Sequence, residues 1–198
     1  MSFFRNLRSL WNRSLSIRII STTFLMSSIL ITIIGLALIN RVSTGILSAK
    51  ETASITEANS AIKDAQRVIT ATDTGASTLT ITSIVDTAVN ALADRAGQSG
   101  LYDVLFLTSP ELSSFGFPER GTNLVAVTSV SEELKSQVQN SSNLLWSYTQ
   151  INYLDGRNVP GLVIGAPIEI RNFGTYLLFL LFPLQQEEET INIIQSSV

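Results

Sequence analysis

The hydrophobic pattern of the chain is dominated by one uninterrupted apolar stretch near its start. Residues 19–40 contain no charged side chain, whereas Arg18 precedes them and Arg41 follows them. A helix of about 20 residues crosses a hydrocarbon core roughly 30 Å thick. The serine and threonine residues within the stretch can return their hydroxyls to the helix backbone, so they do not prevent insertion. The pattern therefore predicts a transmembrane helix over residues 19–40.

Beyond this stretch the apolar residues recur with helical spacing. They predict a long helix whose two half-stripes are joined by a small phase shift, and a second helix that ends at Gly97 after a break around Gly75. The stripe of the long helix is close to a heptad seam. Two interpretations of it remain open, namely packing against its own domain or additional pairing with a second copy. The stripe comprises Val42, Ile46, Ala49, Ala53, Ile55, Ala58, Ile62, Ala65 and Ile69.

The remainder of the chain changes to strand-like segments with short connections. A capping-box spacing from Ser129 to Glu132 predicts a short helix that ends near Asn140. The Asp155-Gly156 pair predicts a hairpin turn, and residues 172–174 turn the next pair of strands. A final helix begins near Leu184. The predicted strands cover residues 101–107, 123–127, 144–153, 158–170 and 175–182.

This order of elements predicts an α+β fold with a long N-terminal helix and one antiparallel sheet. By analogy of element order, it predicts a PAS-like or single-Cache sensor domain. The expected organisation is a cytoplasmic basic segment (1–18), the transmembrane helix (19–40), an extracytoplasmic sensor domain (41–183) and an exit helix (184–198). The exit helix is expected to lead toward a second span beyond the last residue, which leaves a fragment and a natural truncation as alternatives.

Charge gives the expected orientation of the chain in the membrane. Residues 1–50 hold six of the thirteen basic residues and none of the sixteen acidic ones. The positive-inside rule therefore places the N-terminus in the cytoplasm and residues 42–198 outside the cell membrane. A cleaved signal peptide is the competing interpretation, but its apolar region usually has only about 7–15 residues, which favours an uncleaved anchor. The acidic remainder is a poor match to nucleic acid.

Two residue types that carry much of enzyme chemistry are missing. The chain has no His and no Cys. These 198 residues therefore exclude a Ser-His-Asp triad, a histidine metal ligand, a thiol nucleophile and a disulfide. No glycine-rich phosphate loop is present either. We predict no catalytic, cofactor-binding or metal-binding residue within them.

Two groups of residues remain as functional candidates. Trp146 and Tyr148 alternate on one face of a strand and could stack against a ligand such as a glycan, although packing on the sheet is the competing interpretation. Phe182, Pro183 and Leu184 join the last strand to the exit helix. Proline cannot donate to a sheet ladder and restricts the backbone. We therefore predict signal transmission through this segment, with simple strand termination by Pro183 as the alternative.

The acidic residues are weaker candidates for a carboxylate pair or a cation site. Asp103, Asp155 and Glu169 show no spacing that supports a carboxylate pair, since Asp155 fits its turn and Asp103 fits a strand edge. Residues 187–189 are three consecutive glutamates in the first turn of the expected final helix, where negative charge suits the helix dipole.

Several strings of residues resemble the N-terminal region of the MtrB family of actinobacterial two-component sensor histidine kinases. They occur in order along most of the chain, and none of them is catalytic. The strings are residues 13–18 (RSLSIR), 45–50 (GILSAK), 100–104 (GLYDV), 159–167 (VPGLVIGAP) and 181–190 (LFPLQQEEET).

This resemblance implies the sensor portion of a dimeric kinase. Such a kinase has two transmembrane helices around an outer sensor, a cytoplasmic linker domain, a phosphoacceptor-histidine domain and an ATP-binding domain. Its partner would be a cognate response regulator, and its process envelope homeostasis and division. ATP and Mg²⁺ would belong to a kinase domain outside these 198 residues. The alternative is a stand-alone, single-pass envelope binding or scaffold protein, and the reading frame after codon 198 would discriminate the two.

Overall fold

The computed structural model describes residues 15–73, 81–97, 101–109, 119–171 and 173–184. The chain divides into two compact units, and Leu47–Thr190 form the second of them. Helix α2 (Leu15–Asp73) has residues in both units. Its Arg18–Leu38 segment is the one part of the described chain that is long and apolar enough to cross a membrane, and none of that segment is buried within the structure. The apolar helix that we predict over residues 19–40 is therefore present.

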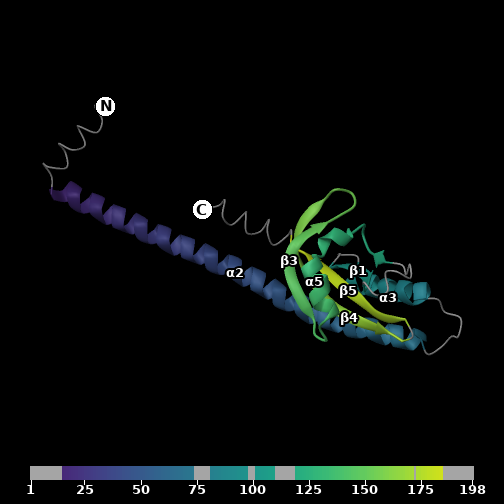
Figure 1. The fold of residues 1–198 in the computed structure, drawn as a ribbon. Helices are drawn as coiled ribbons and strands as arrows, with labels where there is room; N and C mark the ends of the chain where they lie inside the picture. The colour runs from purple at the N-terminus through teal and green to yellow at the C-terminus, as the bar shows by residue number, and fades with distance from the viewer. Residues whose placement is uncertain (1–14, 74–80, 98–100, 110–118, 172, 185–198) are drawn as a thin grey trace. The chain divides into compact units, whose positions relative to one another are not determined.

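The second unit is built around a five-stranded antiparallel sheet with the strand order β2-β1-β5-β4-β3 (Figure 1). The α+β class is thus confirmed. Among the described residues of this unit, the helical elements after α2 are α3 (Ile81–Ala96), the 3₁₀ helix η1 (Val127–Ser129) and α5 (Glu132–Gln139). The strands are β1 (Asp103–Thr108), β2 (Arg120–Gly121), β3 (Leu145–Asn152), β4 (Asn158–Ile170) and β5 (Gly174–Pro183).

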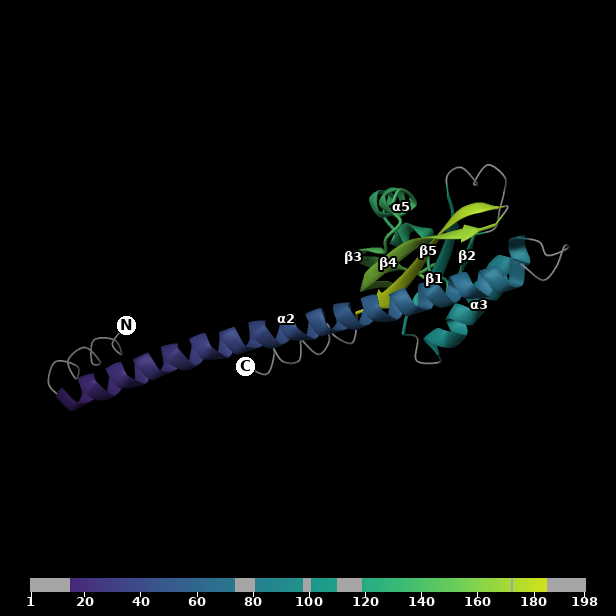
Figure 2. The ribbon, with the colours of Figure 1, turned by 90° about the horizontal axis from the view of Figure 1, so that it is seen from below.

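Helices cover both faces of the sheet, and alternate residues of β5 supply apolar side chains to each face. Successive strand side chains point to opposite faces. Leu178 and Leu180 belong to an apolar cluster with α3 and the last turns of α2, whereas Phe179 and Leu181 belong to a second cluster with α5. Figures 1 and 2 show α5 on one face and α3 on the other. The middle of β5 is therefore a continuous apolar run, because helices cover both of its faces.

The stripe that we predict on the long helix packs against the sheet within its own domain. Ala58, Ala65 and Ile69 are buried, and Ile55 and Ile62 are half-buried against the same cluster. Earlier in the helix, Val42 is 45% exposed. Packing against the domain is therefore confirmed for the second half of the stripe. Pairing with a second copy stays a prediction.

Two local predictions before the hairpin are wrong. Residues 123–127 do not form a strand, because Asn123 and Leu124 adopt left-handed backbone angles (φ 50° and 60°) and only a single bridge joins Val125 to Tyr153. The cap of the short helix is Ser131, whose side chain accepts a hydrogen bond from the Leu134 N–H at 3.2 Å.

Ser129, which we predict as that cap, is buried elsewhere. Its hydroxyl donates to the Asn152 carbonyl at 3.0 Å and accepts from the Asn152 N–H at 2.8 Å. The capping-box spacing is therefore coincidental, because Ser129 satisfies the edge of β3 instead of the helix end.

The β3–β4 hairpin forms as predicted. Gly156 has φ +89°, a backbone angle that favours glycine, and the Tyr153 N–H donates to the Arg157 carbonyl at 2.9 Å. Register then runs from Asn152 opposite Asn158 along the two strands. The predicted exit helix lies outside the described residues from position 185 onward.

Candidate functional site

Trp146 and Tyr148 lie on one face of β3, as the alternation predicts. Their rings meet edge to face, with centroids 5.7 Å apart and planes at 84°. They are 41% and 47% exposed, respectively. The Tyr148 hydroxyl donates a hydrogen bond to Glu51 Oε2 at 2.7 Å. Partial burial and this bond together raise the pKa of Tyr148 to about 12. The pair therefore links the edge strand to α2, and contact with a ligand stays a prediction.

The segment from Phe182 to Leu184 packs into the core of the domain. Phe182 is buried and its ring lies 5.2 Å from that of Tyr102. Leu184 is buried in the same cluster. The end of β5 is thus tied to the sheet face on which α2 and α3 pack.

Strand β5 ends at Pro183, as the strand-termination alternative expects, although one further backbone hydrogen bond follows it. Pro183 pairs with Gly161, and the Leu184 N–H then donates to the Pro160 carbonyl at 2.8 Å. Pairing of β5 with β1 already ends at Leu181 opposite Asp103. Pro183 therefore has a strand neighbour on one side only, where a proline is tolerated. A role in signal transmission stays a prediction.

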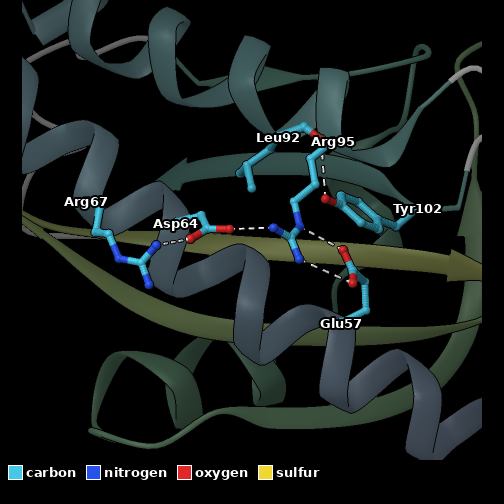
Figure 3. Close-up of polar contacts among 6 residues, drawn as sticks. All are labelled: Glu57, Asp64, Arg67, Leu92, Arg95 and Tyr102. Atoms are coloured by element: carbon cyan, nitrogen blue, oxygen red, sulfur yellow. Dashed lines mark hydrogen bonds and ion pairs between the residues drawn. The ribbon is translucent and has the colours of Figure 1, made fainter.

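An ionic cluster that the sequence analysis did not identify joins α3 to α2 (Figure 3). Arg95 of α3 donates through Nε to Glu57 Oε1 at 2.8 Å and through Nη2 to Glu57 Oε2 at 3.4 Å. It also forms an ion pair with Asp64 Oδ2. The other carboxylate oxygen, Asp64 Oδ1, accepts a hydrogen bond from Arg67 Nη1 at 2.5 Å. The hydrogen bond to Glu57 is the main cause of the raised pKa of Arg95.

Tyr102 connects this cluster to the first strand. Its hydroxyl donates to the Leu92 carbonyl at 3.3 Å, as Figure 3 shows, and its side chain is buried. Burial, with a smaller contribution from Glu57, raises its pKa to about 12. Arg95 and Glu57 therefore join α3 to α2, and Tyr102 joins the entry to β1 to α3 through the Leu92 carbonyl. Glu57 and Asp64 recur on the same helix face, which is the only sequence signal that could have suggested the ionic cluster.

The three acidic residues considered as a carboxylate pair lie in separate environments. Asp155 pairs with Arg157 within the hairpin turn at 2.7 Å, as its turn position suggests. Glu169 is exposed and contributes its main-chain carbonyl to a bond from Gln66. Asp103 is the first residue of β1, yet it is only 5% exposed. No group of three or more potential ligands gathers into a metal site among the residues that the structure describes.

Several known sensor histidine kinases are similar in sequence to this chain. No family model matches the chain. The chain is 24% identical over 196 residues to the sensor histidine kinase MtrB of Mycobacterium leprae, which covers 95% of this chain and 32% of that protein. This chain resembles the MtrB sensor histidine kinases. The MtrB proteins of Mycobacterium tuberculosis and Mycolicibacterium paratuberculosis match at the same 24%, over 194 residues each. The chain thus spans about a third of the length of these MtrB relatives.

The similarity confirms the resemblance that the ordered strings indicate. It supports a region of a two-component sensor, and with the apolar Arg18–Leu38 helix it is consistent with a membrane location. The match to MtrB does not rest on a catalytic motif, because the chain has no His to accept a phosphoryl group.

Proposed function

We propose that this chain is the membrane-anchored, extracytoplasmic sensor portion of a two-component sensor histidine kinase. The observation that carries the proposal is the similarity to MtrB along 95% of the chain, which includes both the apolar helix and the α+β domain. In this proposal the N-terminus lies in the cytoplasm and residues 42–198 lie outside. The four arginines before the apolar stretch support that orientation.

The domain is of the PAS-like or single-Cache kind in this proposal. Its long N-terminal helix, its sheet order β2-β1-β5-β4-β3 and the helices on both faces support that assignment. These features belong to the fold and not to a binding site.

Transmission would use the elements that meet at the α2 face of the sheet. An outer stimulus that favours one packing of α2 against the sheet would shift the population of two states. The bonds from Tyr148 to Glu51 and from Arg95 to Glu57 are the polar contacts that such a shift would remake. Phe182, Pro183 and Leu184 would carry the movement from the end of β5.

The proposed partners follow from the kind of protein. We propose a homodimer in the membrane, a cognate response regulator reached through the cytoplasmic kinase, and no nucleic acid. ATP and Mg²⁺ would be bound only by that kinase portion, not by these 198 residues.

A chimera tests the proposal. Residues 1–198 would replace the matching segment of Mycobacterium tuberculosis MtrB, and phosphorylation of its response regulator would be followed in membrane vesicles. We expect phosphorylation to remain detectable, and Pro183→Ala to change its level while membrane abundance stays the same. Lys63→Gln, at an exposed position of α2, is the control and should leave the level unchanged.

The outcomes discriminate the alternatives. A chimera that is abundant, folded and without any phosphorylation would favour the stand-alone envelope binding or scaffold protein. Unchanged output from Pro183→Ala across conditions would remove Phe182, Pro183 and Leu184 from transmission and leave Pro183 as a strand end.

A further inference from the structure

A cavity of about 510 Å³ lies beside the end of β5, away from Trp146 and Tyr148. Its volume is within the range of about 300–1,000 Å³ that is typical of small-molecule sites. Side chains of both charges contribute to its wall, together with apolar surface. The lining residues are Asp103, Asn123, Leu124, Tyr153, Arg157 and Pro183.

The negative side of the cavity is a buried carboxylate that only neutral groups satisfy. Asp103 accepts hydrogen bonds from Asn123 Nδ2 at 2.6 Å, from the Tyr153 hydroxyl at 2.7 Å and from the Thr122 hydroxyl at 3.5 Å. No ion pair to Asp103 occurs within the described part of the chain. A buried carboxylate that is hydrogen-bonded only by neutral groups and forms no ion pair gains from a nearby cation, even though Arg157 faces the same cavity. The cavity therefore offers a ligand cation a favourable place.

The positive side is Arg157, and most of its hydrogen-bonding capacity is open. Its guanidinium carbon lies 4.4 Å from the centre of the Tyr153 ring, and its Nε donates to Asp155 at 2.7 Å. No bond to Nη1 or Nη2 is found between described residues, and the side chain is 62% exposed. The bond to Asp155 is the main cause of its raised pKa, and the charge of Asp103 adds to it. Two Nη groups can hold a carboxylate in a bidentate manner.

The backbone beside these groups is strained. Asn123 and Leu124 are consecutive non-glycine residues with positive φ, a backbone region that such residues adopt only at a cost. The strain places the Asn123 amide on Asp103 and leaves Leu124 61% exposed at the cavity. Leu124 and Pro183 supply an apolar wall. Strain of this kind gathers at binding sites, where the surrounding structure maintains it.

We propose that this cavity binds a small zwitterion of the α-amino acid type, with its ammonium group at Asp103 and its carboxylate at the Nη groups of Arg157. The ligand side chain lies against Leu124 and Pro183. Binding itself does not depend on the proposed function. Only its consequence does, since Pro183 belongs to the segment that we propose for transmission.

Calorimetric titration of the whole chain in detergent micelles tests the site. The probes are glycine, L-alanine, L-leucine and L-glutamine, each titrated separately. L-Leucine is then compared with 3-methylbutylamine, which lacks the carboxylate, and with 4-methylpentanoate, which lacks the ammonium group. We expect saturable binding of at least one of the four amino acids. For L-leucine and for any other probe that binds, the matching amine and acid should each bind at least tenfold more weakly.

Variants assign the binding to these residues. Arg157→Gln should weaken amino-acid binding at least tenfold, and Arg157→Lys should lose less because it keeps the charge. Arg67→Gln is the control arginine and should bind like the original chain. Asp103→Asn should also weaken binding, but because it alters a buried network, only preparations with an unchanged circular dichroism spectrum count.

Three results would overturn the proposal. They are no saturable binding of any of the four amino acids to folded chain, an amine or an acid that binds as tightly as its amino acid, and unaltered affinity in Arg157→Gln. None of these measurements uses a kinase, so failure here is distinct from failure of the chimera.

Discussion

Arg95 Nε donates a hydrogen bond to Glu57 Oε1 at 2.8 Å, which joins α3 to α2. The two side chains are 32% and 33% exposed, so water screens part of their attraction. The arrangement is nevertheless bidentate and includes a second acid, Asp64. It therefore fixes the position of α3 along α2 in a way that apolar packing of small side chains such as Ala58 and Ala61 does not.

Removing the Arg95 charge is expected to weaken the domain modestly. Arg95→Gln should lower the free energy of unfolding by about 1 kcal/mol, the upper value for exposed ion pairs. Urea denaturation measures the change, and a double-mutant cycle with Glu57→Gln isolates the coupling. The coupling should shrink in concentrated salt, because salt screens exposed charges. A coupling of zero at low salt would show that α2 and α3 are held by apolar contacts alone.

The four tyrosines predict how stability changes at high pH. Burial is the largest cause that raises the pKa of Tyr102, Tyr148 and Tyr176 to about 12, and it also raises the pKa of Tyr153. These are all the tyrosines of the chain. The unfolded pKa is near 10, so their contribution is complete below that pH and is lost as pH rises through about 12. Ultraviolet titration should therefore detect tyrosinate in urea well before it does in the native chain. Coincident titration curves would contradict the raised pKa of these tyrosines in the folded chain.

A close approach between α5 and the sheet makes Gly165 sensitive to substitution. A Cβ added there would lie 2.5 Å from Phe179 Cε1 and 2.9 Å from Val138 Cγ2. Gly165→Ala should therefore lower the free energy of unfolding by about 1–3 kcal/mol, the usual cost of overpacking. Gly45→Ala is the matched control, because a Cβ at that helical position meets nothing within 4 Å. Equal unfolding midpoints for the two variants would argue against this packing of α5.

The orientation of the chain is open to a direct labelling experiment. The chain has no native Cys, so each introduced Cys reports alone. In intact cells, an impermeant maleimide should label Lys63→Cys, an exposed position of α2, but not Ser2→Cys. Both should react after lysis. Labelling of Ser2→Cys in intact cells would reverse the orientation, and a mature N-terminus near Lys50 would show that the apolar helix is removed.

Pairing of two copies along α2 predicts a periodic cross-linking pattern. Single Cys residues placed one at a time at positions 43–50 should cross-link with a helical period, strongest where the predicted stripe faces its partner. Ile46 should lie at a maximum. Oxidative cross-linking in membranes, read on a denaturing gel, measures the pattern. Equal cross-linking at every position would indicate chance collisions between neighbouring chains.

Local sequence patterns were sufficient to predict an element where one residue type or one hydrophobic period dominates the segment. The 158–170 strand, the Asp155-Gly156 turn and the helix beginning with Ile81 agree with the structure. Each is determined by short-range preferences, since glycine tolerates positive φ and buried strands need continuous apolar residues. The predicted strand at residues 123–127 failed because a tertiary contact, Asn123 with Asp103, accompanies a backbone that local propensity disfavours.

The sequence by itself determined an apolar helix, an α+β domain after it and the absence of histidine and cysteine chemistry. It could not determine that Arg95 reaches Glu57, or that Asp103, Tyr153 and Arg157 share a cavity wall. Glu57 and Arg95 lie on different helices, and Asp103 is far in sequence from the β3–β4 connection that carries Tyr153 and Arg157, so their approach depends on strand order and helix placement. Periodicity depends on neighbours along the chain and is therefore visible in sequence, whereas contacts between charges far apart in sequence depend on how the whole chain packs its core.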